Sequence, residues 1–191
     1  LPCMSAQYFR MTTINLPWEY IGGEYLAEGI LEEYGTQHSI VRAGPFHPPF
    51  IIADLHPLAT QVIKEKFDAS GFKGFGWQPV RKKKICMIRW QEWDFKAPTP
   101  PFAPQYNSAR DFLNAQSHSW EAETTMGAIW EITLKNNGVF IDSFTYKPGD
   151  PTIDIMVGGN RFWILVTPRA KEWIEANCGE WVEFDEVVVT T

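Results

Sequence analysis

Regular alternation of apolar and polar residues between Trp130 and Leu134 is the feature that most constrains how this chain folds. An apolar residue stands at every second position of this segment, which is typical of a β-strand with one buried face. Residues 136–138 (Asn-Asn-Gly) tolerate a positive φ, so the pattern predicts a tight turn there. We expect residues 139–146 to return beside the first strand and residues 153–157 to complete an antiparallel meander.

Helix and strand signals alternate along the rest of the chain and predict an α+β fold, with a largely antiparallel sheet and packed helices. Pro57 and Pro168 are placed in the first turns of two helices, because the fixed φ of proline suits that position, and Thr167 is expected to cap the second helix. The basic run at residues 81–84 is expected in a turn between two strands. Helices are expected at residues 22–35, 57–69, 108–116 and from 168 onward, and further strands at residues 50–52, 75–93, 162–166 and 181–189.

A proline-rich segment divides the chain. Residues 97–105 (APTPPFAPQ) contain four prolines, which cannot continue a helix or a central strand. We therefore expect a linker at residues 97–106. It joins residues 1–96, which hold an N-terminal helix and a first strand–helix–strand half, to residues 107–191, which hold the meander and a second helix–strand half. The two parts are expected to pack as one compact unit.

The two halves also resemble each other. Aligning Pro57 with Pro168 places Ile63 on Ile174, and both segments then read as an apolar strand, a helix and an alternating strand. One interpretation is a pair of related half-modules. The other is that any strand–helix–strand unit of this length produces such an alignment.

Composition and charge indicate a globular, soluble protein that binds a basic partner. Of the 191 residues, 45% are hydrophobic, and 9 Trp and 13 Phe can fill a core. No uninterrupted apolar run approaches the about 18–20 residues of a membrane helix, so no membrane partner is expected. The net charge of −6 is concentrated at the chain ends: the last twenty residues hold six acids and no base. This argues against general nucleic-acid binding and favours a basic protein partner.

Motifs for catalysis and metal binding are lacking in the sequence. There is no phosphate-binding loop, HExxH pair or GxSxG elbow, so we expect a non-enzymatic protein without a cofactor. The four histidines (His38, His47, His56 and His118) have neither i, i+4 spacing nor cysteine partners, and no metal site is expected. Cys3, Cys86 and Cys178 are far apart, which is typical of reduced thiols and of a cytoplasmic protein.

Carboxylates near both chain ends are the candidate contact residues for a basic partner, since opposite charge accelerates association. Solvated faces without a partner are the alternative interpretation. Two tryptophans, Trp173 and Trp181, are candidate hot spots if they are exposed. The candidate contact set is Glu28, Glu32, Glu172, Glu175, Trp181, Glu183 and Asp185.

Residues 71–80 (GFKGFGWQPV), which follow an expected helix, resemble the strand ending of immunity protein family eleven of bacterial polymorphic toxin systems. That ending has the form Gly-x-x-Gly-x-x-Phe-x-x-Val, and residues 167–187 look like a second copy. The matching positions are Gly71, Gly74, Trp77 and Val80 in the first copy and Gly179, Phe184 and Val187 in the second.

The resemblance implies an immunity protein that binds and neutralises a cognate secreted toxin by occluding or distorting its toxic domain. A nuclease toxin would suit the acidic chain ends, because phosphate-binding surfaces are usually basic. The alternative function is a small-molecule or carbohydrate-binding module that uses a tryptophan-rich surface.

Overall fold

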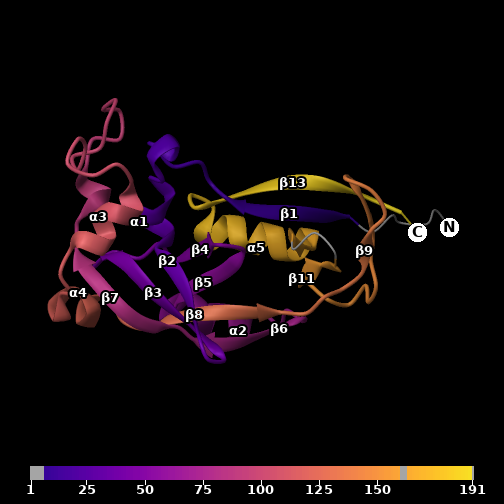
Figure 1. Cartoon of the computed structure of the whole chain (residues 1–191). Helices are drawn as coiled ribbons and strands as arrows, with labels where there is room; N and C mark the ends of the chain where they lie inside the picture. Colours follow the sequence, from indigo (N-terminus) through magenta and orange to yellow (C-terminus); the bar gives the residue numbers. More distant parts are fainter. Residues whose placement is uncertain (1–6, 160–162, 191) are drawn as a thin grey trace.

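Thirteen strands, five α-helices and two 3-10 turns form the α+β fold of the computed structural model, which describes residues 7–159 and 163–190 (Figure 1). The predicted fold class is confirmed. In chain order the elements are β1 (Tyr8–Thr13), η1 (Glu19–Ile21), α1 (Glu24–Glu28), β2 (Ile30–Tyr34), β3 (Gln37–Gly44), β4 (Phe50–Ala53), β5 (His56–Thr60), α2 (Gln61–Ala69), β6 (Phe75–Pro79), β7 (Arg81–Met87), η2 (Trp90–Glu92), α3 (Ala109–Ala115), α4 (Trp120–Met126), β8 (Ile129–Leu134), β9 (Val139–Phe140), β10 (Thr145–Lys147), β11 (Ile155–Gly158), β12 (Trp163–Val166), α5 (Pro168–Cys178) and β13 (Val182–Val189).

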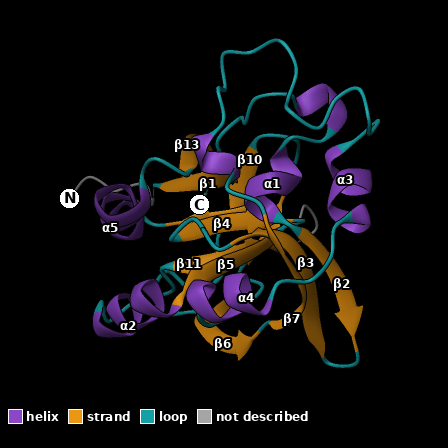
Figure 2. Ribbon diagram, turned by 90° about the vertical axis from the view of Figure 1, so that its left-hand side faces the viewer, coloured by secondary structure: helices purple, strands orange, loops and turns teal. Residues whose placement is uncertain are grey.

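The strands of the described residues form three sheets. Their orders are β11-β12-β1-β13-β10-β9, β4-β5-β8-β6 and β2-β3-β7. Neighbouring strands are antiparallel except in the pairs β3–β7 and β10–β13. Helices α2 and α5 lie on the same side of the molecule, whereas α1 and α3 lie together on the other side (Figure 2).

Two of the sheets repeat one topology. The array β4-β5-β8-β6 and the array β11-β12-β1-β13 share the same strand directions, because β8 is antiparallel to β5 and β6 as β1 is antiparallel to β12 and β13. In both arrays an α-helix directly follows the second strand and leads to the last one. The third strand of each array comes from the other half of the chain, so the two halves are interlocked.

The helices α2 and α5 begin in the same way. Thr60 and Thr167 both have φ −72° and ψ 163°, and each side chain accepts a hydrogen bond from the backbone amide three residues later. The predicted cap at Thr167 is confirmed. The predicted start at Pro57 is wrong, because Pro57 lies in β5 opposite Ile52. Thr60 and Thr167 are therefore the equivalent positions of the two halves, in place of Pro57 and Pro168.

One apolar core lies under both helices. Phe67 of α2 packs edge-to-face on Trp173 of α5, with ring centroids 5.2 Å apart. The same cluster of buried residues includes Met11 of β1 and Ile132 of β8, the two exchanged strands. Burial of this apolar surface, which favours folding in proportion to its area, therefore depends on side chains from both halves at once.

The N-terminal helix is shorter than predicted. The helix expected at residues 22–35 ends at Glu28, and Ile30–Tyr34 forms β2, paired with β3. Gly29 separates the two elements with φ 81°, and a Cβ there would lie 2.9 Å from the side chains of Ile40 and Arg42. This close approach fixes a left-handed residue at the point where a helix would have to continue.

The predicted meander is also wrong. Strand β8 pairs with β5 and β6 rather than with β9, which pairs with β10, and β11 pairs with β12. The turn at 136–138 does not connect the two strands of a hairpin. Instead, the side chain of Asn137 donates to the backbone oxygen of Asp150 and accepts from its amide, while Asn136 forms a parallel bridge with Val157.

The basic run at residues 81–84 lies within β7 and not in a turn. The predicted strands at 50–52 and 181–189 and the predicted helix at 108–116 are confirmed with small changes of boundary, and Ser108 caps that helix. The strand expected at 162–166 is β12, although Phe162 and Cys3 lie outside the described residues. Cys86 and Cys178 are buried free thiols, and burial raises the pKa of Cys178 to about 12.

The proline-rich segment at 97–106 packs against the N-terminal part of the chain. The indole of Trp18 donates to the backbone oxygen of Ala97, and the hydroxyl of Tyr20 donates to that of Pro98. Phe102 is buried and stacks on Phe112 of α3, with centroids 4.8 Å apart. The segment is thus part of a second apolar core beside the sheet β2-β3-β7.

Candidate functional site

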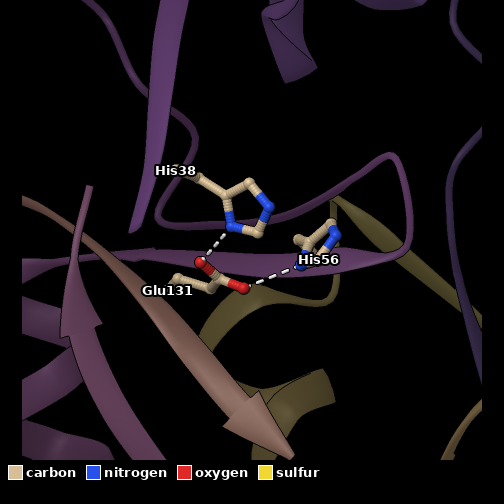
Figure 3. Close-up of side chains that lie close together, drawn as sticks. All are labelled: His38, His56 and Glu131. Atoms are coloured by element: carbon tan, nitrogen blue, oxygen red, sulfur yellow. Dashed lines mark hydrogen bonds and ion pairs between the residues drawn. The ribbon is translucent and has the colours of Figure 1, made fainter. Parts of the chain in front are cut away.

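Two histidines and a buried glutamate meet between two sheets (Figure 3). Nδ1 of His38 lies 2.7 Å from Oε2 of Glu131, and Nδ1 of His56 lies 2.7 Å from Oε1. The imidazole centroids are 4.2 Å apart. In both rings the second nitrogen, Nε2, points away from the carboxylate (Figure 3). We call these three residues the His–Glu–His cluster.

Strand register explains why these side chains converge. Glu131 of β8 lies between Leu58 of β5 and Gln78 of β6, and directly opposed residues share a face of a sheet. His56 is two residues before Leu58, so it lies on the same face. His38 reaches the cluster from β3 in the neighbouring sheet.

The carboxylate of Glu131 is held in its charged form. Burial, which leaves 6% of the side chain exposed, raises its pKa. Hydrogen bonds from His56, Gln78 and His38 oppose this effect, and the net pKa is lowered to about 2. The hydrogen bond between His56 and Glu131 also raises the pKa of His56 above its usual value.

Two cavities flank the turn between β4 and β5. The cavity on the side of the cluster has a volume of about 400 Å³ and is lined by His56, Glu131 and Val157, among others. The cavity on the other side, of about 310 Å³, is lined by Arg10, Glu28 and Trp163, among others. Asp54 and Leu55 line both. These turn residues have φ 47° and φ 70°, a strained conformation for residues other than glycine.

Glu28, one of the candidate contact residues, lines the smaller cavity and is half-buried. Burial, together with the nearby carboxylates of Glu24 and Asp54, raises the pKa of Glu28 to about 8. Arg10 lines the same cavity, and Arg110 lines the adjoining hollow with Glu24, Glu28 and Asp54.

Replacement of Glu28 by Gln should remove a loss of stability at alkaline pH. In the folded state the carboxyl group of Glu28 keeps its proton up to about pH 8. In the unfolded chain the same group loses its proton above its ordinary pKa of 4.5. The free energy of unfolding therefore falls between pH 4.5 and about 8, and the penalty is complete only above that range. In urea denaturation we expect the free energy of unfolding of Glu28→Gln to exceed that of the wild type by about 1–3 kcal/mol at pH 9. At pH 4 the two free energies should differ little. Glu32→Gln, at a solvent-facing ion pair, is the matched control, and parallel pH profiles of Glu28→Gln and wild type would contradict the assignment.

The predicted contact residues do not form one surface. Lys171 of α5 lies over the rings of Phe9 and Phe184, so α5 covers that face of its sheet. Glu183 and Asp185 alternate with Phe184 along β13 and lie on the opposite face. Glu172 and Glu175 are exposed on α5, and Glu32 lies on β2 in another sheet.

Several of these acids also have basic partners from outside their own segment. Asp185 pairs with Arg10 at 2.5 Å and Glu32 with Lys83 at 2.5 Å, while Glu175 pairs with Lys171 on its own helix at 2.6 Å. The expectation that the acidic C-terminal segment lacks compensating bases is therefore wrong for Asp185 and Glu175.

Tryptophans mostly serve the core. Trp173 and Trp181 are half-buried, and Trp181 packs on Trp90 and Phe46. Trp90 itself is buried. Only Trp120, at 76%, is highly exposed among the tryptophans. Every other tryptophan is half-buried or buried.

Two lysines of the basic run in β7 cap the C-terminal ends of helices. Nζ of Lys84 donates to backbone oxygens of Asn114 and Gln116 at the end of α3, and Nζ of Lys82 donates to those of Glu123 and Gly127 at the end of α4. Cations at helix C-termini satisfy orphan carbonyls and interact favourably with the helix dipole. Lys82 and Lys84 are therefore engaged by backbone oxygens within the protein.

An exposed apolar patch lies at the far end of the six-stranded sheet, where β9 forms the edge (Figure 1). Phe140 and Tyr146 are opposed and buried, so the residues that alternate with them face outward. Val188 is opposite Thr145 and lies on the same outward face. We call the following residues, which are 52–74% exposed, the apolar patch: Val139, Ile141, Phe144 and Val188.

Neither the His–Glu–His cluster nor the apolar patch was predicted from the sequence. The members of the His–Glu–His cluster are 75 and 93 residues apart along the chain, so no local spacing marks them. Glu131 was part of the alternation at 130–134, where a polar residue predicts a solvated face. The expectation that the histidines are scattered fails for His38 and His56, whose rings are in contact.

Comparison with known proteins adds no assignment. No family model, curated protein or solved structure matches the chain. The resemblance to immunity protein family eleven therefore stays a prediction. No helix of the described residues is long and apolar enough to cross a membrane.

Proposed function

We propose that this protein is an immunity protein that binds and neutralises a basic toxin domain, and that it acts by binding and not by catalysis. The observation that carries the proposal is the apolar patch at the β9 end of the six-stranded sheet. Contiguous exposed apolar side chains mark interaction sites more often than scattered ones do.

Charge favours a basic partner for this surface. Glu186 is exposed and lies two residues before Val188 on β13, so it borders the apolar patch on the same face. The chain as a whole carries a net charge of −6. Lys147, opposite Val139, is also exposed on this face, so the charge argument for a basic partner depends on Glu186 and on the net charge of the whole chain. The sequence resemblance at residues 71–80 and 167–187 supports the same class of function.

The test is capture of a partner from the native cell, followed by growth assays. We expect one stoichiometric partner whose expression alone arrests growth and whose co-expression with this protein restores it. Ile141→Ser and Phe144→Ser should weaken binding at least about 30-fold and abolish protection, because central apolar anchors dominate interface energies. Both side chains are highly exposed, so the variants should fold normally.

Trp120→Ser is the matched control, because Trp120 is equally exposed but lies on α4, at the opposite end of the molecule (Figure 1). This variant should bind and protect as the wild type does. Wild-type protection by both patch variants would exclude the apolar patch as the contact surface. A captured partner that is harmless when expressed alone would exclude the immunity function.

A small-molecule binding function is the second candidate, favoured by the cavity of about 400 Å³ beside His56 and Glu131. This volume is in the range of small-ligand sites. Quenching of tryptophan fluorescence by members of a metabolite panel would support it. Such quenching should persist in Phe144→Ser, which separates this function from partner binding.

A further inference from the structure

We propose that His38, His56 and Glu131 bind one divalent transition-metal ion of the zinc type, with solvent from the adjoining cavity completing the coordination. This inference goes beyond the proposed function and does not depend on it. The site combines two imidazoles and one carboxylate, a ligand set that suits zinc, cobalt and nickel.

The spacing of the three side chains fits a metal centre. One ligand atom from each residue can be chosen such that all three lie within 4.8 Å of one another. Ligands of a tetrahedral ion with bonds of about 2.0–2.1 Å are separated by about 3.3 Å. Each Nδ1 lies 2.7 Å from a different oxygen of Glu131, so the ion would replace both hydrogen bonds and the side chains would adjust to the tetrahedral separation.

Proton placement is compatible with ligation through Nδ1. An imidazole that ligates through Nδ1 carries its proton on Nε2. In both histidines Nε2 points away from Glu131 (Figure 3), and the side chains are 18% and 36% exposed. Each proton can therefore move from Nδ1 to a solvated Nε2 when the ion binds.

A further side chain holds the carboxylate in place. Nε2 of Gln78 donates to Oε2 of Glu131 at 2.7 Å, and such outer hydrogen bonds orient metal-ligating carboxylates. The four side chains project from four different strands, β3, β5, β6 and β8, which limits their movement. The cavity lined by His56 and Glu131 supplies the open side from which the ion and its water ligand enter.

The experiment titrates metal-free full-length protein with Zn²⁺ by calorimetry and with Co²⁺ by visible absorption. We expect one site per chain with a dissociation constant in the micromolar range or below, and a Co²⁺ spectrum typical of four ligands. His38→Gln and His56→Gln should each weaken Zn²⁺ binding at least tenfold. Zn²⁺ should raise the melting temperature of the wild type but not of these variants.

His118→Gln is the matched control. His118 also pairs with a glutamate, Glu123, at 3.1 Å, but the pair has no second histidine. This variant should retain wild-type affinity. Absence of Zn²⁺ binding in the wild type, or equal affinity in His38→Gln and His56→Gln, would overturn the proposal and leave the cluster as a hydrogen-bonded support for a buried carboxylate. Because Phe144→Ser should bind the ion normally, failure of the partner assay does not affect this test.

Discussion

Neither half of this chain should fold without the other. Strand β1 lies between β12 and β13, and β8 lies between β5 and β6. A fragment that ends before residue 107 therefore lacks the central strand of its four-stranded array, and so does the remainder of the chain. Because both exchanged strands also contribute to the common core, each fragment would expose apolar surface that is buried only in the pair.

A cleavable sequence inserted between Pro104 and Gln105, two exposed residues, tests this expectation. After cleavage the two fragments should stay associated through the exchanged strands. When they are separated in urea and refolded alone, neither should show a cooperative transition or protected amides. Mixing should restore both, with protection of β4–β6 and of β11–β13 returning together. An isolated fragment with native hydrogen-exchange protection would contradict the interlocked arrangement.

Gly74→Ala should destabilise the protein by about 2–5 kcal/mol, the sum of left-handed strain and overpacking. Gly74 has φ 101°, and a Cβ there would lie 2.2 Å from Cγ2 of Ile153 and 2.6 Å from the backbone oxygen of Ile155. The contact with Ile155 involves the backbone of β11, so rotation of a side chain cannot relieve it. The chain after α2 therefore crosses β11 at a point where only glycine fits.

The variant Gly71→Ala separates the cost of left-handed strain from the cost of overpacking. Gly71 has a comparable φ of 72°, but no atom lies within 4 Å of a Cβ built there. We expect this variant to lose only about 1–2 kcal/mol, the cost of left-handed backbone alone. The free energy of unfolding of both variants would be measured by urea denaturation. Equal losses would mean that the approach of β11 to Gly74 is not tight.

The glycines also limit the likeness between the two halves. Gly71 and Gly179 both follow a helix, and the sequence places them at matching positions. Gly71 is left-handed, whereas Gly179 has φ −60° and remains helical. The shared topology of the two arrays is thus accompanied by different exits from α2 and α5.

Local signals predicted local structure well. Ser108 and Thr167 mark the starts of α3 and α5, and the alternation at 130–134 marks β8, because caps and periodicity act within a few residues. The helix expected at 22–35 failed because Gly29 is fixed by contacts with β3, which the sequence does not reveal. The partners of β8 could not be predicted, since β5 and β6 are selected by packing over long separations and not by the turn at 136–138.

The candidate site was less predictable than the fold. Glu131 follows the same alternation as a solvated residue, and its contact with His38 comes from a strand of another sheet, β3. The apolar patch has a similar origin, because Val139 of β9 and Val188 of β13 come onto one face of a sheet only through the pairing of β10 with both strands. When a site is assembled from residues of several strands, the spacing of those residues along the sequence does not reveal it.

The turn at Asp54 and Leu55 is a common wall of the two cavities. Its carboxylate acts on both sides, since the charge of Asp54 raises the pKa of Glu28 in one cavity and that of His56 in the other. The ionisation of Glu28 and that of His56 are thereby linked through the charge of a single carboxylate, although the two side chains line different cavities.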